Sequence, residues 1–148
     1  CVERLRRYFP GCALTADMIT GFPSETEADQ AAAVAFLEQV GFAAVHVFPY
    51  SRRPGTKADA MPEQLSHAVK SARAHEAQRV ADGCKQRYLA QQVGRILPVL
   101  FETEHDGNWV GHSDNYCLVR AAGDDLRGLV KNVKISAVSG QMLVGDLV

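Results

Sequence analysis

The first half of this 148-residue chain is organised around one stretch, Ala16-Asp17-Met18-Ile19-Thr20-Gly21-Phe22-Pro23-Ser24-Glu25-Thr26-Glu27. Its apolar start predicts a buried strand over 13–20, and Gly21-Phe22-Pro23 predicts a tight turn. Ser24 and Glu27 have the S-x-x-E spacing of a capping box, so we expect a helix from about Glu25. A strand that leads directly into a helix leaves unpaired backbone N–H groups at the carboxyl end of the strand, where α/β proteins bind ligands.

A second apolar run lies one helix further along the chain. Apolar residues at helical spacing extend the predicted helix to Val40, and Gly41 is placed to end it in a left-handed cap. The run Ala43–Phe48 then predicts a second buried strand. Strand, helix and strand at this spacing predict a βαβ unit, in which the two strands are parallel.

Two further helices are expected around this unit. The apolar pattern over 2–9 predicts a short amphipathic helix. A long helix is expected over 63–92, opened by Met61-Pro62, with Gly83 as the point at which it could split. Residues 52–87 carry eight lysines and arginines against four carboxylates, so this part of the chain is basic.

From Val93 onward, apolar residues recur with a period of two, in short runs separated by turn residues such as Asp106-Gly107. Five strands are expected, over 95–103, 109–113, 116–122, 129–138 and 142–148. Five short strands in about 55 residues fit a small closed barrel of the OB type. The sequence therefore predicts an α/β domain over 1–92 and an all-β domain over 93–148.

The overall composition excludes several classes of protein. The 16 lysines and arginines balance 17 carboxylates, so net charge indicates neither an acidic nor a basic partner. Cysteines 1, 12, 84 and 117 form no CxxC pair and read as reduced thiols of a cytoplasmic protein. No signal peptide and no run of about 18 apolar residues is present, so no membrane association is expected. The chain begins without Met inside a predicted helix, which suggests a piece of a longer protein.

Several residues near the strand ends are candidates for binding. Gly21-Phe22-Pro23 could present bare backbone to a ligand, although a βα turn also uses these residues for folding alone. Glu25 and Glu27 could bind a cation or a sugar, or serve only the helix dipole. His46, inside an apolar strand, is expected more as a hydrogen-bonded core residue than as a ligand.

Basic and aromatic side chains are candidates for contacts to nucleic acid. Arg52 and Arg53 follow the second strand and could hold a phosphate or carboxylate, or lie in a solvated loop. Stacking and phosphate contacts of the kind that OB-like folds use are expected from Arg95, Trp109, Tyr116, Lys131 and Lys134. With five cations against seven carboxylates over 93–148, this domain would need the preceding basic helix to supply much of the field.

Three runs, Asp17–Thr26, His46–Thr56 and Gly111–Tyr116, together resemble the radical-SAM methylthiotransferases that modify tRNA. The pair D-x-I-x-G-F-P-x-E-T and F-P-Y-S-x-R-x-G-T, about 25 residues apart, carries most of this resemblance. The third run most resembles the branch that acts on threonylcarbamoyladenosine beside the tRNA anticodon. The resemblance implies the C-terminal part of a radical-SAM partial (β/α) barrel followed by a TRAM domain that holds tRNA, and it adds Asn115 to the expected RNA contacts.

The resemblance also implies cofactors. S-adenosylmethionine would be cleaved reductively to a 5'-deoxyadenosyl radical, and sulfur and methyl would be placed on the modified adenosine. The residues expected beside its adenosyl group are Ile19, Gly21, Phe22, Phe48 and Tyr50. Two 4Fe-4S clusters are expected in the parent protein, but the family's CxxxCxxC loop is absent from this sequence and none of its cysteines matches a cluster ligand.

Because of these absences, we expect this chain to bind neither a cluster nor S-adenosylmethionine by itself, and to be inactive. Ser24 also stands where the family usually has Gly. The unpaired edge of the predicted parallel strands could pair with a second copy of the chain. Two other interpretations stay open, a non-catalytic RNA-binding module and a structural α/β domain with a barrel appended.

Overall fold

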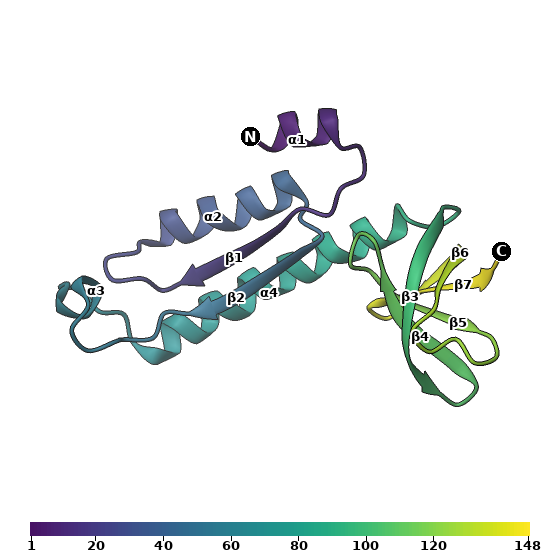
Figure 1. Cartoon of the computed structure of the whole chain (residues 1–148). Helices are drawn as coiled ribbons and strands as arrows, with labels where there is room; N and C mark the ends of the chain where they lie inside the picture. The colour runs from purple at the N-terminus through teal and green to yellow at the C-terminus, as the bar shows by residue number, and fades with distance from the viewer. The chain divides into compact units, whose positions relative to one another are not determined.

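The computed structural model describes all residues from Cys1 to Val148, and the chain divides into two compact units (Figure 1). The α/β unit comprises Val2 and Leu14–Lys85, and the β unit comprises Cys1, Glu3–Ala13 and Gln86–Val148. The helices and the first two strands are α1 (Val2–Tyr8), β1 (Thr15–Thr20), α2 (Glu27–Val40), β2 (Ala44–Pro49), α3 (Lys57–Ala60) and α4 (His67–Ala90).

The α/β unit is built on two parallel strands, β1 and β2, as the βαβ spacing predicts. One face of this sheet packs with α2 and α4 (Figure 1). That core contains Leu37, Val40, Phe42, Val45, Ala77 and Ala81, with Ala16, Met18 and Val47 partly buried against it. Burial alternates along both strands, so their other face is open to solvent. The prediction of fully buried strands is therefore wrong for that face.

The start of α2 differs from the predicted one. The helix begins at Glu27, and its capping box is formed by Thr26 and Asp29 in place of Ser24 and Glu27. The Thr26 hydroxyl accepts a hydrogen bond from the Asp29 N–H at 3.2 Å, and the Asp29 carboxylate accepts one from the Thr26 N–H at 2.9 Å. Ser24 lies outside the helix, in the left-handed region with φ 66°. The end of the helix is as predicted, because Gly41 is in the left-handed conformation and its N–H binds the Leu37 carbonyl.

The long helix is also shorter than predicted. Residues 57–60 form the separate helix α3, which ends on Met61 in an extended conformation, and Glu63 has a φ of 56°. Neither conformation continues a helix, so α4 begins only at His67. It then runs without interruption through Gly83 to Ala90.

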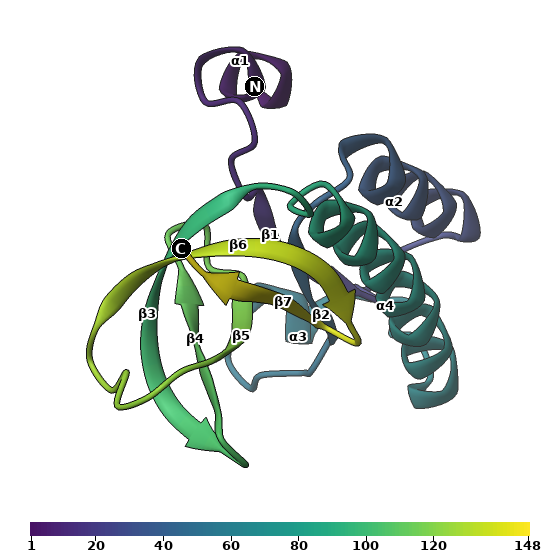
Figure 2. The same ribbon diagram turned by 90° about the vertical axis from the view of Figure 1, so that its right-hand side faces the viewer.

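The β unit contains the five predicted strands, each within two residues of its expected bounds: β3 (Ile96–His105), β4 (Asn108–Ser113), β5 (Leu118–Ala122), β6 (Val130–Ser139) and β7 (Met142–Leu147). Their order is β3-β4-β5-β7-β6, and β6 pairs back with β3, so the ladder returns to its first strand (Figure 2). The pair β5–β7 is parallel and the other pairs are antiparallel. Side chains that alternate along the strands fill the interior, with Val99, Phe101, Val119, Val133 and Leu143 fully buried.

The close approach of two strands depends on one glycine of β4. A Cβ atom at Gly111 would lie 2.0 Å from the Leu100 carbonyl oxygen on β3, so no other residue fits at this rung. Across the whole chain, none of the helices has the length and hydropathy that a bilayer span requires.

Candidate functional site

The turn after β1 is held by Glu25. The Gly21 N–H donates to both carboxylate oxygens of Glu25, at 2.9 and 3.0 Å, and the Phe22 N–H lies 3.4 Å from one of them. These are the backbone donors that the sequence suggested would be unpaired at the strand end. That expectation is wrong, because a side chain of the turn itself occupies them.

Arg73 of α4 in turn holds Glu25. The Arg73 side chain is 7% exposed and donates to the Glu25 carboxylate at 2.6 Å and to the Glu25 carbonyl at 2.9 Å. It also donates to Glu27 at 2.6 Å. The bonds to Glu27 and then Glu25 raise the pKa of Arg73 above its usual value, against the effect of burial. Glu25 and Glu27 therefore bind an arginine of the same chain, where the sequence suggested a cation, a sugar or the helix dipole.

Gly21 is required by packing as well as by conformation. Its φ of +70° is one that glycine adopts without strain. A Cβ atom there would lie 2.6 Å from Cγ and 3.1 Å from Cα of Lys70. The position without a side chain thus faces α4, which is the folding role that the sequence left open beside a ligand-facing one.

Two aromatic residues lie beside this glycine. The rings of Phe22 and Tyr50 meet edge to face at 5.2 Å between centroids, and the Lys70 ammonium is 4.9 Å from the Tyr50 ring centroid. Gly21, Phe22 and Tyr50, three of the predicted cofactor residues, therefore form one cluster at the carboxyl ends of β1 and β2. Sequence reasoning missed Lys70 and Arg73, because nothing local to α4 distinguishes them from its other basic residues.

The remaining two predicted cofactor residues share a rung of the sheet. Ile19 of β1 is the register partner of Phe48 of β2, and their side chains are 56% and 50% exposed. His46 stacks on Phe48, with 6.3 Å between ring centroids and 13° between planes. His46 is exposed, so its prediction as a core residue is wrong. The cause is that this two-stranded sheet has only one covered face.

Two buried hydroxyls at the same end of the sheet have no hydrogen-bond partner. These are Oγ1 of Thr20, which is fully buried, and the phenol oxygen of Tyr50. The backbones of the two residues are joined by a 2.8 Å hydrogen bond from the Tyr50 N–H to the Thr20 carbonyl. An unpaired buried hydroxyl costs free energy, and these two oxygens have no exposed surface at which a ligand could reach them.

The loop after β2 separates its two arginines. Arg52 binds the carboxylate of Asp59 at 2.7 Å through Nε and the carbonyl of Asp59 at 3.0 Å through its guanidinium. Arg53 is exposed, and its carbonyl accepts a hydrogen bond from the Thr56 hydroxyl at 2.8 Å. Arg52 thus fastens α3 to the loop although its side chain is 56% exposed, and Arg53 is exposed as well.

In the β unit, a rigid loop between β4 and β5 presents Tyr116. Its side chain is 87% exposed, and its φ of 60° is strained for a residue other than glycine. The Ser113 hydroxyl donates to Asn115 Oδ1 at 2.6 Å and accepts from the Cys117 N–H at 3.1 Å. Asn115 donates to the Tyr88 hydroxyl at 3.1 Å and to Gln92 at 3.2 Å. Asn115 therefore fixes the loop, and the loop holds Tyr116 in solvent.

The other predicted nucleic-acid residues of the β unit do not share one surface role. Lys131 and Lys134 are exposed on β6. Arg95 is exposed and binds Gln92 at 2.7 Å. Trp109 is 6% exposed, so its ring has no open face for a base, and the stacking role predicted for it is not supported. Burial alternates along β4, and Trp109 lies on the inward side.

The chain has no preformed metal centre. No three side chains of His, Cys, Asp or Glu are grouped so that they could hold a metal ion. None of the four cysteines forms a disulfide, and Cys84 and Cys117 are buried.

The structure by itself places the chain among two-unit α/β plus all-β proteins. Its α/β unit has one open sheet face, and a five-stranded β unit follows it. The chain is 36% identical over 140 residues to the threonylcarbamoyladenosine tRNA methylthiotransferase MtaB of Bacillus subtilis. This alignment covers 90% of the present chain and 31% of the relative. It is 39% identical over 149 residues to the tRNA-2-methylthio-N(6)-dimethylallyladenosine synthase of Maricaulis maris, in an alignment that covers 99% of this chain and 33% of that relative. The synthase of Campylobacter jejuni is 35% identical over 147 residues, covering 98% and 34%.

These relatives are enzymes by name, and the chain spans about a third of their length. The matches to these tRNA methylthiotransferases include 90–99% of the residues of this chain, so the chain is homologous to one third of such an enzyme. No family model matches the chain.

Proposed function

We propose that this chain forms one wall of the S-adenosylmethionine site, and the RNA-contacting domain, of a radical-SAM tRNA methylthiotransferase. The observation that carries the proposal is the pairing of the two motif runs on neighbouring parallel strands, with Ile19 and Phe48 on one rung. Residues 1–92 would then be the C-terminal part of a radical-SAM partial barrel, and residues 93–148 a TRAM-like barrel. The five-stranded order of the β unit supports the second assignment.

The residues of the α/β unit fit an adenosyl group. Ile19 and Phe48 offer an exposed apolar surface of the size of one flat ring system. The hydroxyls of Thr20 and Tyr50 are buried, and Thr20 lies on the covered face of β1, so neither is assigned a contact to the adenosyl group. Gly21 and Phe22 would support this wall from the turn, and Tyr50 from the second strand.

When bound, S-adenosylmethionine supplies the methyl group and the radical chemistry of the reaction. The residues of this chain would bind and orient its adenosyl part. No residue is assigned to the two iron–sulfur clusters, because no cysteine of the chain belongs to a group that fits one. For this reason we expect no methylthiolation from the 148 residues alone. An anaerobic assay with reconstituted iron and sulfide that gave product would contradict this expectation.

The proposed substrate is a tRNA adenosine, next to the anticodon, that already carries a modification. The relatives include enzymes named for threonylcarbamoyladenosine and for dimethylallyladenosine. The Gly111–Tyr116 run leads us to propose the threonylcarbamoyl branch, with cytoplasmic tRNA as the partner. A second copy of the chain could pair along the open edge of β1 or β2, and light scattering that gives the mass of a monomer would contradict this pairing.

Binding of S-adenosylmethionine tests the proposal. Isothermal titration of the full-length parent enzyme should detect binding, and Phe48→Ala should weaken it by about tenfold, since the variant removes most of the apolar rung. Phe36→Ala is the matched control, because Phe36 is 53% exposed on α2, away from the rung. Absence of binding, or equal weakening by both variants, would contradict the assigned wall.

A second candidate function is a non-catalytic RNA-binding module. The exposure of Tyr116, Lys131 and Lys134 favours it, because these side chains need no cofactor to contact RNA. A salt titration of tRNA binding tests this role, since each neutralised phosphate steepens the log–log dependence of affinity on salt. The module is favoured if the chain binds tRNA while Phe48→Ala leaves S-adenosylmethionine binding by the parent enzyme unchanged. A chain that binds no tRNA at low salt excludes both RNA roles.

A further inference from the structure

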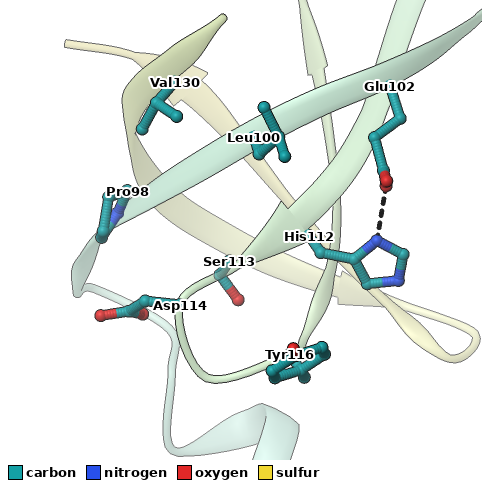
Figure 3. A pocket seen from close by; sticks show the side chains of 8 residues that line it. All are labelled: Pro98, Leu100, Glu102, His112, Ser113, Asp114, Tyr116 and Val130. Carbon is teal, nitrogen blue, oxygen red and sulfur yellow. Dashed lines mark hydrogen bonds and ion pairs between the residues drawn. The ribbon is translucent and has the colours of Figure 1, made fainter. Parts of the chain in front are cut away.

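We propose that a pocket of about 480 Å³ on the outer surface of the β unit binds a single unpaired nucleobase of the RNA and selects bases with an exocyclic amino group (Figure 3). The pocket is lined by β3, β4, β6 and the loop that carries Tyr116. This inference rests on the proposed RNA role and adds to it the class of base that the β unit recognises.

The floor of the pocket is aliphatic. Leu100 of β3 and Val130 of β6 are register partners, and they are 42% and 63% exposed. Their neighbours Val99 and Phe101 are fully buried in the interior, so the alternation of β3 places Leu100 on the outside. Pro98 extends this surface along the same strand. The faces of a base are flat and largely apolar, and would cover it.

One wall of the pocket is the ring of Tyr116. The hydrogen bonds of Ser113 and Asn115 fix the loop, so this ring is held in solvent at the cost of a strained backbone. A loop whose backbone is fixed before its ligand arrives loses little backbone freedom on binding. Aromatic side chains presented in this way are the usual stacking partners of single-stranded bases.

The polar edge of the pocket consists mainly of hydrogen-bond acceptors. Glu102 and Asp114 carry carboxylates, and Glu102 lies 2.6 Å from Nδ1 of His112. Figure 3 shows the Glu102 side chain directed toward the His112 ring, and Tyr116 on the loop below it. A carboxylate accepts from the N–H₂ group of adenine or cytosine, but it meets only a carbonyl oxygen at the same position of uracil. The edge therefore favours amino-bearing bases over uracil.

Positive charge lies next to the pocket and not inside it. Lys134 of β6 pairs with the exposed Ile96 of β3, on the outer face of the strand that forms the floor, whereas Lys131 is exposed but pairs with the buried Val99. The carboxylates would repel a phosphate from the pocket itself, so the lysines are the place for the RNA backbone. The base would therefore enter the acidic pocket, and the phosphates would lie beside it.

The test compares short labelled oligoribonucleotides of A, C and U for binding to the 148-residue chain by fluorescence anisotropy at fixed salt. We expect A and C to bind more tightly than U. Tyr116→Ala should weaken A and C by roughly tenfold. Tyr116→Gly should weaken them equally, and it relieves the backbone strain, so it controls for a loop that fails to fold. Tyr8→Ala, which removes a 65% exposed tyrosine of the same unit, should leave binding unchanged.

Glu102 tests the selectivity. Glu102→Gln introduces an amide that can donate to uracil, so the preference for A and C over U should shrink severalfold. Glu104→Gln, an exposed glutamate of the same strand, is the matched control.

Three outcomes overturn the inference. If the chain binds tRNA with a salt-dependent affinity, but A, C and U bind equally and Tyr116→Ala has no effect, the pocket is not a base site and the proposed function stands. If tRNA does not bind at all, the RNA role and the inference fail together. If Tyr116→Ala changes the mass measured by light scattering and not RNA binding, the surface is a protein contact.

Discussion

Arg73 is the residue on which the order of the strand-end turn depends most directly. Its guanidinium compensates the charge of Glu25, whose side chain is 15% exposed. Breaking one partner of such a buried pair costs about 3–5 kcal/mol, whereas the bond to the 88% exposed Glu27 contributes little.

We therefore predict that Arg73→Met lowers the free energy of unfolding by about 3 kcal/mol in a urea titration. Arg79→Met, an exposed arginine of the same helix, should change it by less than about 0.5 kcal/mol. Equal effects of the two substitutions would show that helix propensity, and not the ion pair, controls stability here.

In the β unit, Tyr88 is the side chain whose hydrogen bonds hold a loop in place, as Arg73 does in the α/β unit. Its hydroxyl donates to the Gly11 carbonyl at 3.0 Å and accepts from Asn115 at 3.1 Å. Burial is the main cause that raises the pKa of Tyr88 above its usual value of 10.0. A raised pKa of a phenol favours its neutral form in the folded state, so this stabilisation is present below pH 10 and is lost as the pH rises through the folded-state value.

Tyr88→Phe should lower the free energy of unfolding by about 1–3 kcal/mol at neutral pH, because two hydrogen bonds are lost. It should also flatten the decline in stability above pH 10. Thermal denaturation of both proteins across this range is the measurement. A variant with the same alkaline slope as the parent would assign that slope to other groups.

At the scale of elements, the start of α2 depends on the capping box. The hydrogen bond from the Thr26 side chain is the main cause that lowers the pKa of Asp29 below its usual 3.8. A carboxyl with a lowered folded-state pKa stabilises the fold above its usual value, and this contribution is lost as the pH falls through the lowered one.

Thr26→Ala should cost about 1 kcal/mol at neutral pH. Asp29→Asn should reduce the pH dependence of stability below pH 3.8, as followed by circular dichroism during acid titration. Thr15→Ala, at an exposed position of β1, provides the comparison. If it costs as much as Thr26→Ala, the cap has no special role.

Some elements follow from local sequence and others do not. The five strands of the β unit were predicted to within two residues, because their alternation and their turns are local. Asp106 and Gly107 adopt the positive φ values that their turn requires. The helix start was not predictable in this way. Two overlapping boxes, at Ser24 and Thr26, compete, and the choice depends on Arg73, which is distant in sequence and draws Glu25 out of the helix.

The candidate site also has features that follow from local sequence and features that do not. The βαβ spacing predicts that the two strands are parallel, and the resemblance implies that Ile19 and Phe48 lie near one group. The structure places them on one rung. The exposure of His46 and the burial of Trp109 depend on which faces of the two sheets are covered, and no local pattern contains that information. Lys70 beside Gly21 is a further contact between residues far apart in the chain.

At the scale of the whole molecule, charge is distributed unevenly along the chain. Residues 52–87 have an excess of cations, and residues 93–148 an excess of carboxylates. An RNA contact confined to residues 93–148 would depend on a few lysines, so their removal should be measurable in the salt dependence of binding.

We predict that the double variant Lys131→Ala, Lys134→Ala reduces the log–log salt slope of tRNA binding by about 1–2. Lys57→Ala, which removes one cation of the basic segment, should reduce it by no more than about 1. An unchanged slope in the double variant would place the phosphate contacts of the chain elsewhere.

The bonds from Gly21 and Phe22 to Glu25 have a kinetic consequence. The turn is closed by the chain's own carboxylate before any ligand is present, so its amide protons should exchange slowly with solvent in the empty protein. The turn therefore needs no local folding step when a ligand binds beside it. The association rate of that ligand should rise linearly with its concentration, without the plateau that a slow rearrangement imposes.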